Sequence, residues 1–233
     1  MNRTAYEALA SEYYDNSHTT SRNFDAATQE ALRSLRLTMP GGVIVDVGCG
    51  RGRCSEFLHV PPDRVVQLDN SAAMLEVAPR EPAILKVLHD AEELPFPDRE
   101  FAAVAAFLCD PYLGLNFLSE ARRILRADGL LLGTTPSYEW GVALRTELEI
   151  DLMTTRFVLR DGTSLLAPSA LYRVEQLSEM LRQVGFRSSK IDIRTHTLPH
   201  SVTPVSPDIE LPARVLGLSP YQVPILCTFI AAT

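Results

Sequence analysis

Short apolar runs alternate with helical patterns between residues 39 and 134 of the chain. The apolar runs are nearly continuous and rich in β-branched residues, which is typical of strands buried on both faces of a parallel sheet. The alternation therefore predicts an α/β fold with helices on both faces of the sheet. The expected strands are residues 43–47, 65–68, 83–88, 101–108 and 130–134, and the expected helices are residues 54–59, 71–78 and 113–125.

Two segments outside this alternating core are expected to cover it. The N-terminal region has helical patterns over residues 6–14 and 25–37, and the polar run at residues 15–23 predicts a loop between them. Residues 1–38 should thus form a helical cover. The strand and helix rhythm breaks again at residues 136–172, which predicts a small cap inserted over the sheet.

The rhythm returns in the C-terminal part of the chain. A helix is expected over residues 174–184, with Gly185 as its C-terminal cap, and a strand near residues 188–195. Six of the sixteen prolines lie in the stretch 199–224, which predicts a long, stiff excursion. The last strand is expected at residues 223–231, so the core should be completed to seven strands.

Composition narrows the class of protein. The chain has 233 residues, 46% of them hydrophobic, and a net charge of −7, which suits one globular domain over residues 1–233. The longest apolar run, Phe101–Cys109, is much shorter than the roughly 20 residues of a membrane span. Charged residues near the start argue against an export signal, so a cytoplasmic location is expected. Reduced thiols are expected at Cys49, Cys54, Cys109 and Cys227.

A glycine-rich loop is the strongest chemical signal. A buried strand runs into Asp46-x-Gly48-x-Gly50-x-Gly52, and a helix follows. Glycines allow the backbone to turn tightly and to approach a ligand, and the helix N-terminus offers free amides to a negative group. A nucleotide-like ligand is therefore predicted. The dinucleotide fingerprint would need glycine where this chain has Arg53, which disfavours NAD.

This loop resembles motif I of the class I S-adenosylmethionine-dependent methyltransferases, [D/E]-x-G-x-G-x-G, at all four positions. The resemblance implies that Asp46 holds the methionine end of the cofactor and that Gly48 and Gly50 let it lie against the backbone. Asp69, about 20 residues on, matches the acidic residue that accepts the ribose hydroxyls. The implied fold is a Rossmann-like seven-stranded sheet, mostly parallel, with an antiparallel last strand.

Two further stretches resemble the same family. Residues 89–101 match its D-A-x-x-L-P-F-x-D-x-x-F stretch, in which Asp90 would accept from the adenine amino group. Residues 117–132 match its E-x-x-R-v-L-k-p-G-G stretch except at Ala127 and Asp128, which puts the turn geometry in doubt. Met74 would pack on the adenine, although a core methionine is as good a reading. The cofactor site predicted in this way comprises Tyr14, Asp46, Gly48, Cys49, Gly50, Gly52, Asp69, Asn70, Met74, Asp90, Ala91, Glu92 and Leu108.

Residues for an acceptor molecule are less well marked. Asp110-Pro111-Tyr112 follows the fourth expected strand and is one proline short of the [D/N]-P-P-[Y/F] motif of amino-methyltransferases, so a plain loop is favoured there. Tyr112 could still line the site, because ligands bind at strand carboxyl ends. His18 is the candidate general base. The predicted acceptor residues are Arg22, Asp110, Tyr112 and Trp140, and the histidine spacing predicts no metal site.

The predicted function is methyl transfer from S-adenosylmethionine to a small-molecule O, N or C nucleophile. Two alternatives stay open: a non-enzymatic S-adenosylmethionine-binding or regulatory protein, and a protein or nucleic-acid methyltransferase. The absence of a basic cluster in the sequence disfavours nucleic acid, no membrane association is expected, and the chain should be a monomer or a homodimer. Residues 14–23, with Tyr14, His18 and Arg22 inward, are expected to close over the site; a solvated connector is the alternative reading.

Overall fold

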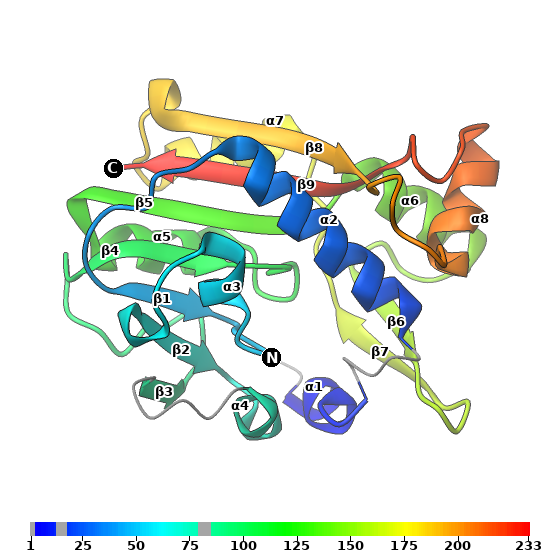
Figure 1. The fold of residues 1–233 in the computed structure, drawn as a ribbon, viewed down its shortest axis with the longest axis horizontal. Coiled ribbons are helices and arrows are strands. Elements are labelled where there is room, and N and C mark those ends of the chain that lie inside the picture. The colour runs from blue at the N-terminus through cyan, green and yellow to red at the C-terminus, as the bar shows by residue number, and fades with distance from the viewer. Residues whose placement is uncertain (1–2, 13–17, 79–84) are drawn as a thin grey trace.

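The computed structural model describes residues 3–12, 18–78 and 85–233 (Figure 1). Seven strands form one sheet: β1 (Ile44–Val47), β2 (Val65–Asp69), β3 (Leu85–Leu88), β4 (Phe101–Ala106), β5 (Leu125–Pro136), β8 (Ile191–Thr197) and β9 (Pro224–Ala232). Their order is β3-β2-β1-β4-β5-β9-β8. Only the last strand, β9, runs antiparallel to its neighbours, β5 and β8. The predicted α/β fold and its seven-stranded, mostly parallel sheet are confirmed.

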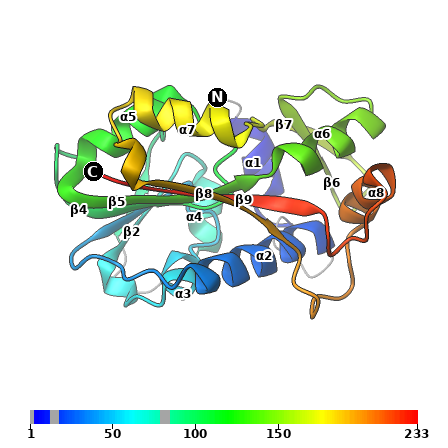
Figure 2. The same ribbon diagram turned by 90° about the horizontal axis from the view of Figure 1, so that it is seen from above.

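Helices cover both faces of the sheet (Figure 2). One face carries α2 (Thr19–Leu35) and α3 (Cys54–Leu58), and the other carries α5 (Leu115–Ile124) and α7 (Val174–Gln183). The short helix α4 (Ala72–Val77) contacts β2 and β3. Every residue of β1 and β4 is buried, because these strands lie between two helical layers. This burial explains why their sequences are apolar without alternation.

The start of α2 differs from the predicted loop at residues 15–23. The helix begins at Thr19, one turn or more before the predicted helix start at residue 25. Its first turn is held by distant partners: Thr20 Oγ1 donates to Asp208 Oδ2 (2.7 Å), and Asn23 exchanges hydrogen bonds with the backbone of Pro204 and Ser206. These contacts satisfy polar side chains that would otherwise favour a turn. A short helix, α1 (Arg3–Leu9), precedes α2.

A group of elements lies beyond the carboxyl ends of the parallel strands (Figure 1). It comprises α6 (Tyr138–Glu147), the hairpin of β6 (Thr154–Val158) and β7 (Ser164–Pro168), and α8 (Pro207–Leu216). The first three occupy the predicted cap. The helix α8 was not predicted, because its region is rich in proline. Short 3-10 turns lie at Pro62–Arg64 and Ser188–Lys190.

The helix α8 tolerates its two prolines for separate reasons. Pro207 occupies the first turn, where no amide donor is needed, and the Ser206 side chain caps the helix. Pro212 lies inside the helix and cannot donate to the Asp208 carbonyl. The indole Nε1 of Trp140 on α6 donates to that carbonyl instead, at 2.8 Å. Across the described residues, no helix is both long and apolar enough to cross a bilayer.

Candidate functional site

The glycine-rich loop joins the carboxyl end of β1 to α3. Gly48, Gly50 and Gly52 all have positive φ angles, of 65°, 48° and 70°. Residues with a side chain adopt this left-handed region at a cost, so three glycines in alternation give the loop its shape. The amide of Cys49 donates to the Leu68 carbonyl at the end of β2, which fixes the loop against the neighbouring strand.

The space beside Gly48 is filled by the ring of Tyr112. A Cβ atom at Gly48 would lie 2.6 Å from Cε1 and 2.8 Å from Cζ of Tyr112. The Tyr112 hydroxyl donates to the Val47 carbonyl, and its ring packs edge-on against Phe117. Gly48 is therefore required both for its backbone angle and for the close approach of Tyr112, a contact that the sequence reading did not include.

Two carboxylates, Asp46 and Asp69, face the loop from the ends of β1 and β2. Asp46 is 2% exposed, and burial together with the nearby Asp69 charge raises its pKa well above the usual range, although a backbone bond from Cys54 acts in the opposite direction. Asp69 accepts the amides of Gly50 and Ser71, each at 2.9 Å. Its pKa is also raised, mainly because it is buried. A pair of buried acids attracts hydrogen-bond donors or positive charge.

These groups line a cavity that we call the glycine-loop cavity. Nine residues predicted for the cofactor share its wall, and Tyr112, predicted for the acceptor, joins them. The Thr28 hydroxyl on α2 also belongs to the wall, is buried, and has no hydrogen-bond partner among the residues that the structure describes. The nine predicted residues are Asp46, Gly48, Cys49, Gly50, Asp69, Asn70, Met74, Ala91 and Leu108.

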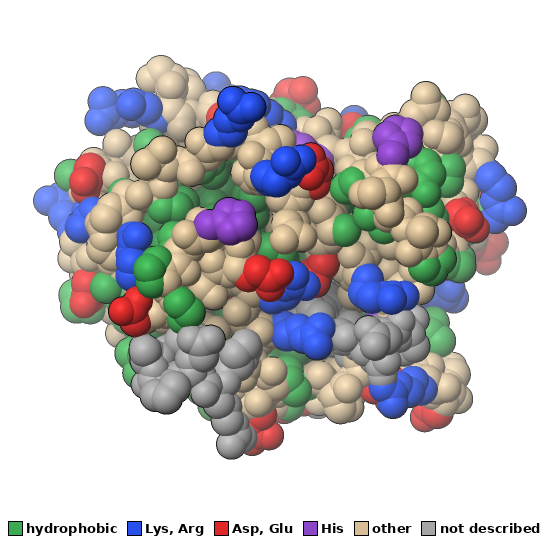
Figure 3. All heavy atoms as spheres, in the orientation of Figure 1, with side chains coloured by type: hydrophobic (Ala, Val, Ile, Leu, Met, Phe, Trp, Pro, Cys, Tyr) green, Lys and Arg blue, Asp and Glu red, His purple; other side chains and the backbone are tan. Residues whose placement is uncertain are grey.

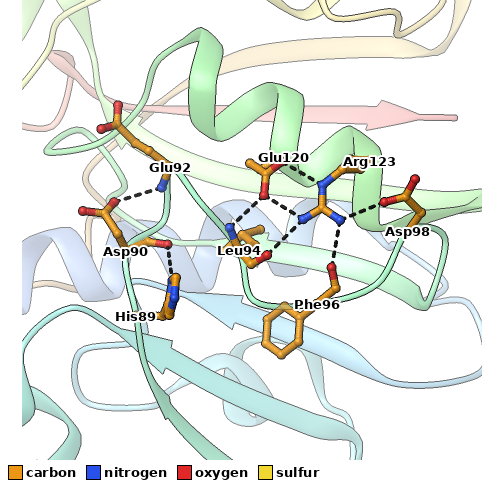
Figure 4. Close-up of polar contacts among 8 residues, drawn as sticks. All are labelled: His89, Asp90, Glu92, Leu94, Phe96, Asp98, Glu120 and Arg123. Atoms are coloured by element: carbon orange, nitrogen blue, oxygen red, sulfur yellow. Dashed lines mark hydrogen bonds and ion pairs between the residues drawn. The ribbon is translucent and has the colours of Figure 1, made fainter.

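Three predicted cofactor residues lie outside this wall. Gly52 is buried in the turn before α3, and Glu92 is exposed. The Asp90 carboxylate accepts the Glu92 amide at 2.9 Å, so it closes a local turn, and the preceding residue, His89, faces the cavity in its place (Figure 4). This bond uses one carboxylate oxygen of Asp90, Oδ1, and orders the turn. The remaining residue predicted for the cofactor, Tyr14, lies outside the described residues.

The loop that follows Asp90 is fixed by one arginine on α5. Arg123 donates to the carbonyls of Leu94 and Phe96 and forms ion pairs with Glu120 and Asp98, at 2.7 and 2.9 Å (Figure 4). These bonds raise the pKa of Arg123 and lower that of Glu120. The wall that includes Ala91 is thus tied to the helix behind it.

Several wall residues were not predicted from the sequence. Arg53, considered only as a missing glycine, pairs with Asp25 of α2 at 2.6 Å and with Glu56 at 2.7 Å. Burial raises the pKa of Asp25 despite this partner. The pair joins α2 to the start of α3 across the cavity wall. No local pattern identifies such residues, because Asp25 and Arg53 lie 28 positions apart in the sequence.

A second and larger hollow, the cap cavity, has a volume of about 510 Å³. The predicted residues His18, Asp110 and Trp140 line it, and Tyr6 and Leu108 line both cavities, so they form the partition between the two. Arg22, predicted to face the acceptor, is instead exposed and donates to Thr19 on its own helix. Its position follows from the helical start of α2, which turns residue 22 away from the cavity.

Comparisons with known proteins agree with this arrangement. Residues 44–129 match the family model of a methyltransferase domain. The malonyl-[acyl-carrier protein] O-methyltransferase of Yersinia pestis is 34% identical over 131 residues, which cover 54% of this chain and 47% of that protein. The protein of the same name from Hamiltonella defensa is 30% identical, over 58% of this chain and 53% of its own length. The chain spans about half the length of these curated relatives.

Solved structures show the same fold over nearly the whole chain. One chain of the complex between the Haloferax volcanii Trm112 methyltransferase activator and a candidate methyltransferase has a TM-score of 0.72 and 18% identity, over 97% of this chain and 96% of its own. A methyltransferase structure from Thermotoga maritima has a TM-score of 0.65 and 19% identity, over 100% of this chain and 99% of its own. At such identities the likeness establishes the fold alone.

Proposed function

We propose that the chain is a class I S-adenosylmethionine-dependent methyltransferase and that it transfers a methyl group to a small-molecule nucleophile held in the cap cavity. The observation that carries this proposal is the pair of buried carboxylates, Asp46 and Asp69, in one cavity with the glycine loop. A ligand that offers a positive charge and several hydrogen-bond donors is the natural partner of such a wall.

The chemistry of the wall fits S-adenosylmethionine. Asp46 would hold the amino group, Asp69 the ribose hydroxyls, and Met74 and Ala91 the adenine ring, while the unpartnered Thr28 hydroxyl is available to a polar group of the ligand. When bound, the cofactor supplies a methyl group that its sulfonium charge already activates. The protein then has to exclude water and to hold the acceptor in line with that methyl group.

The glycine-loop cavity has a volume of only about 100 Å³, which is below the roughly 300 Å³ of typical small-ligand sites, so its wall has to open for a nucleoside. The helix α1 supplies Tyr6 to this wall. Glu7 on α1 accepts the amides of Ala72 and Ala73 at the start of α4, and Glu12 accepts the Arg160 amide of the cap. We expect α1 to open for the cofactor and to reform these bonds afterwards.

The acceptor is proposed to be a small molecule because the cap cavity is enclosed by α6, α8 and the hairpin. On the face shown in Figure 3, the described Lys and Arg side chains are interspersed with Asp and Glu and do not gather into one basic patch. This face gives no electrostatic footprint for nucleic acid among the described residues. A general-base role for His18, a cytoplasmic location and a monomeric or dimeric state stay predictions.

Isothermal calorimetry with S-adenosylhomocysteine and NAD tests the cofactor part of the proposal. We expect S-adenosylhomocysteine to bind with a Kd of about 10 μM or below and NAD to show no heat of binding. Tighter binding of NAD would contradict the proposal. Release of S-adenosylhomocysteine during incubation of S-adenosylmethionine with acceptor mixtures would separate a methyltransferase from a protein that only binds the cofactor.

A further inference from the structure

Asp110 is a buried acid at the meeting point of the two cavities. It lies four residues after the end of β4 and two residues after Leu108, which lines both cavities. Its side chain belongs to the wall of the cap cavity and is 8% exposed. An acid in such a position needs an explanation, because burying a carboxylate costs several kcal/mol unless partners compensate it.

Hydrogen bonds from α6 and the cap hold Asp110 as an acceptor. The buried guanidinium of Arg145 donates to the Ser169 hydroxyl and to the Ser169 carbonyl. An arginine only donates, so the proton of the Ser169 hydroxyl is free to point at the Asp110 carboxylate, which it contacts. The Ala170 amide donates to the Asp110 backbone carbonyl at 2.9 Å, which fixes the main chain. The chain Arg145 to Ser169 to Asp110 therefore favours the ionised carboxylate.

Apolar side chains make up about half of the residues that line the cap cavity, and Arg156, Arg160 and Asp208 are charged groups in the same wall. Phe24 and Trp140 meet edge-to-face at 4.9 Å and form an aromatic wall, since the Trp140 nitrogen is already bonded to Asp208. The Asp208 carboxylate accepts the Thr20 hydroxyl at the start of α8, where helix amides also favour a negative charge. Further apolar side chains complete the wall: Leu108, Leu144, Leu148, Ile150, Phe157 and Leu159.

We propose that the acceptor is an apolar molecule that presents an amine or a hydroxyl to Asp110, and that the same carboxylate excludes acceptors whose nucleophile is a carboxylate. The inference rests on the proposed function, because it concerns the acceptor side of that site. An N–H or O–H group donates a hydrogen bond to Asp110, whereas a carboxylate has no proton to donate and repels the buried charge. Asp110 would thus decide which nucleophile reaches the partition at Leu108.

A purely structural role for Asp110, as the counter-charge of Arg145, predicts different behaviour. In that case the cavity would not distinguish a donor from an acceptor group, and any neutralising change near Arg145 would have a similar effect. Asp151 provides the matched control, because its charge also acts on Arg145 and it lies outside the cavity wall. Its side chain is exposed and accepts the Met153 amide at 2.7 Å.

Three probes with one apolar body test the inference: phenylpropylamine, phenylpropanol and phenylpropionate. Their binding is measured by calorimetry with and without S-adenosylhomocysteine, on the wild type, Asp110→Asn and Asp151→Asn. We expect the wild type to bind the amine and the alcohol about tenfold more tightly than the acid. Asp110→Asn should reduce this preference to about threefold or less, and Asp151→Asn should keep it. The melting temperature of each variant verifies folding.

Equal or tighter binding of phenylpropionate by the wild type would overturn the inference, and so would an unchanged preference in Asp110→Asn or no binding of any probe in the millimolar range. Failure of S-adenosylhomocysteine to bind would instead count against the proposed function, since the probes are also measured alone. The two failures are therefore distinguishable.

The wild type gives a second arm that needs no variant. Burial raises the pKa of Asp110 to about 6, against the opposing effects of Ser169 and Arg145. Above that pH the carboxylate is charged, so the preference for the amine should be largest near neutral pH and should fall as the pH drops through about 6. The series is repeated on His18→Gln, because His18 faces the same cavity. An amine preference that is constant from about pH 5 to 8 would contradict the inference. The charged groups that face this cavity are His18, Asp110, Arg156, Arg160 and Asp208, with Arg145 behind Asp110.

Discussion

The walls of the two cavities come from very different stretches of chain. The glycine-loop cavity takes most of its polar groups from the ends of β1, β2 and β3 and from the residues that follow them. The positive φ angles of Gly48 and Gly50 give its loop its shape. The cap cavity takes its groups from separate segments between Tyr6 and Asp208, chiefly residues 18–21, 155–160 and 206–208 with residues of α6. One cavity is thus shaped by the main chain, and the other by side chains that long-range packing brings together.

Substitutions in the two cavity walls should therefore affect stability and specificity differently. A change in the glycine loop alters a backbone that every ligand of that cavity must approach, so stability and cofactor affinity should fall together. A change in the cap removes one of many side-chain contacts, so it should alter packing or acceptor choice and leave cofactor affinity intact. The four predictions that follow test this contrast, beginning with the largest expected effect.

Gly48→Ala should destabilise the fold most. The new Cβ would collide with the Tyr112 ring at a position with φ of 65°, and strain and overpacking together should cost about 3 kcal/mol in the free energy of unfolding. Gly162→Ala is the matched control: it has φ of 86° but open space, so only backbone strain of about 1 kcal/mol is expected. Urea unfolding measures both. Equal losses would show that Tyr112 does not constrain the loop.

Asp69→Ala should weaken S-adenosylhomocysteine by about tenfold to a hundredfold, because hydrogen bonds to a charged group are lost together with the anchor of Gly50. Asp90→Ala provides the comparison within the same half of the molecule. The Asp90 carboxylate accepts the Glu92 amide and lies outside the cavity wall. The affinity of Asp90→Ala for S-adenosylhomocysteine should therefore differ from that of the wild type by about threefold or less. Calorimetry on both folded variants decides, and a larger loss in Asp90→Ala would support the predicted contact of Asp90 with the adenine.

Trp140→Phe should show the opposite behaviour, a packing defect without a cofactor defect. It removes the only side-chain donor that the structure gives to the Asp208 carbonyl, across the described residues, and Pro212 cannot replace it. A part-buried carbonyl left without its donor should cost about 1 to 2 kcal/mol in the free energy of unfolding, with S-adenosylhomocysteine affinity unchanged. Tyr221→Phe, which removes a bond of similar burial to the Val202 carbonyl, should cost a similar amount. A weakened cofactor in Trp140→Phe would mean that the two cavities are coupled.

The pH dependence of cofactor binding should be smaller still. Burial raises the pKa of Asp46 and of Asp69, so both carboxyls are harder to ionise in the free protein than in the unfolded chain. A donor-rich ligand favours the ionised forms and lowers these pKa values, so binding releases protons. S-adenosylhomocysteine should therefore bind about threefold to tenfold more weakly as the pH falls from about 7.5 to 5.5.

The weaker binding of S-adenosylhomocysteine at low pH should not be caused by unfolding of the protein. For both carboxyls the neutral form favours the folded state, so their contribution to stability is lost as pH rises and gained as it falls. Calorimetry in two buffers of different ionisation enthalpy measures the released protons directly. Proton uptake on binding, or an affinity that rises toward acid pH, would contradict the ionised state proposed for the complex.

The sheet, the glycine loop and the acids at the ends of β1 and β2 could all be predicted from the amino-acid sequence. These features depend on local rules: an apolar strand that is buried on both faces, a glycine where the main chain must be left-handed, and an acid at a strand end. Asp46, Gly48 and Asp69 could be located for that reason. The signals needed no information about residues far away in the chain.

The start of α2, the position of Asp90 and the helix α8 depend on contacts between distant parts of the chain. The polar run at Thr19 is helical because Asp208 and Ser206 form hydrogen bonds with its side chains. The Asp90 carboxylate accepts the nearby Glu92 amide, and His89 lines the cavity. The proline-rich excursion became α8 because Trp140, nearly seventy residues earlier, donates to the carbonyl that Pro212 leaves without a partner. Local propensity is a matter of tenths of a kcal/mol up to about 3 for proline, and a single buried hydrogen bond can offset much of it. Partners that are distant in sequence therefore decide the outcome at such positions.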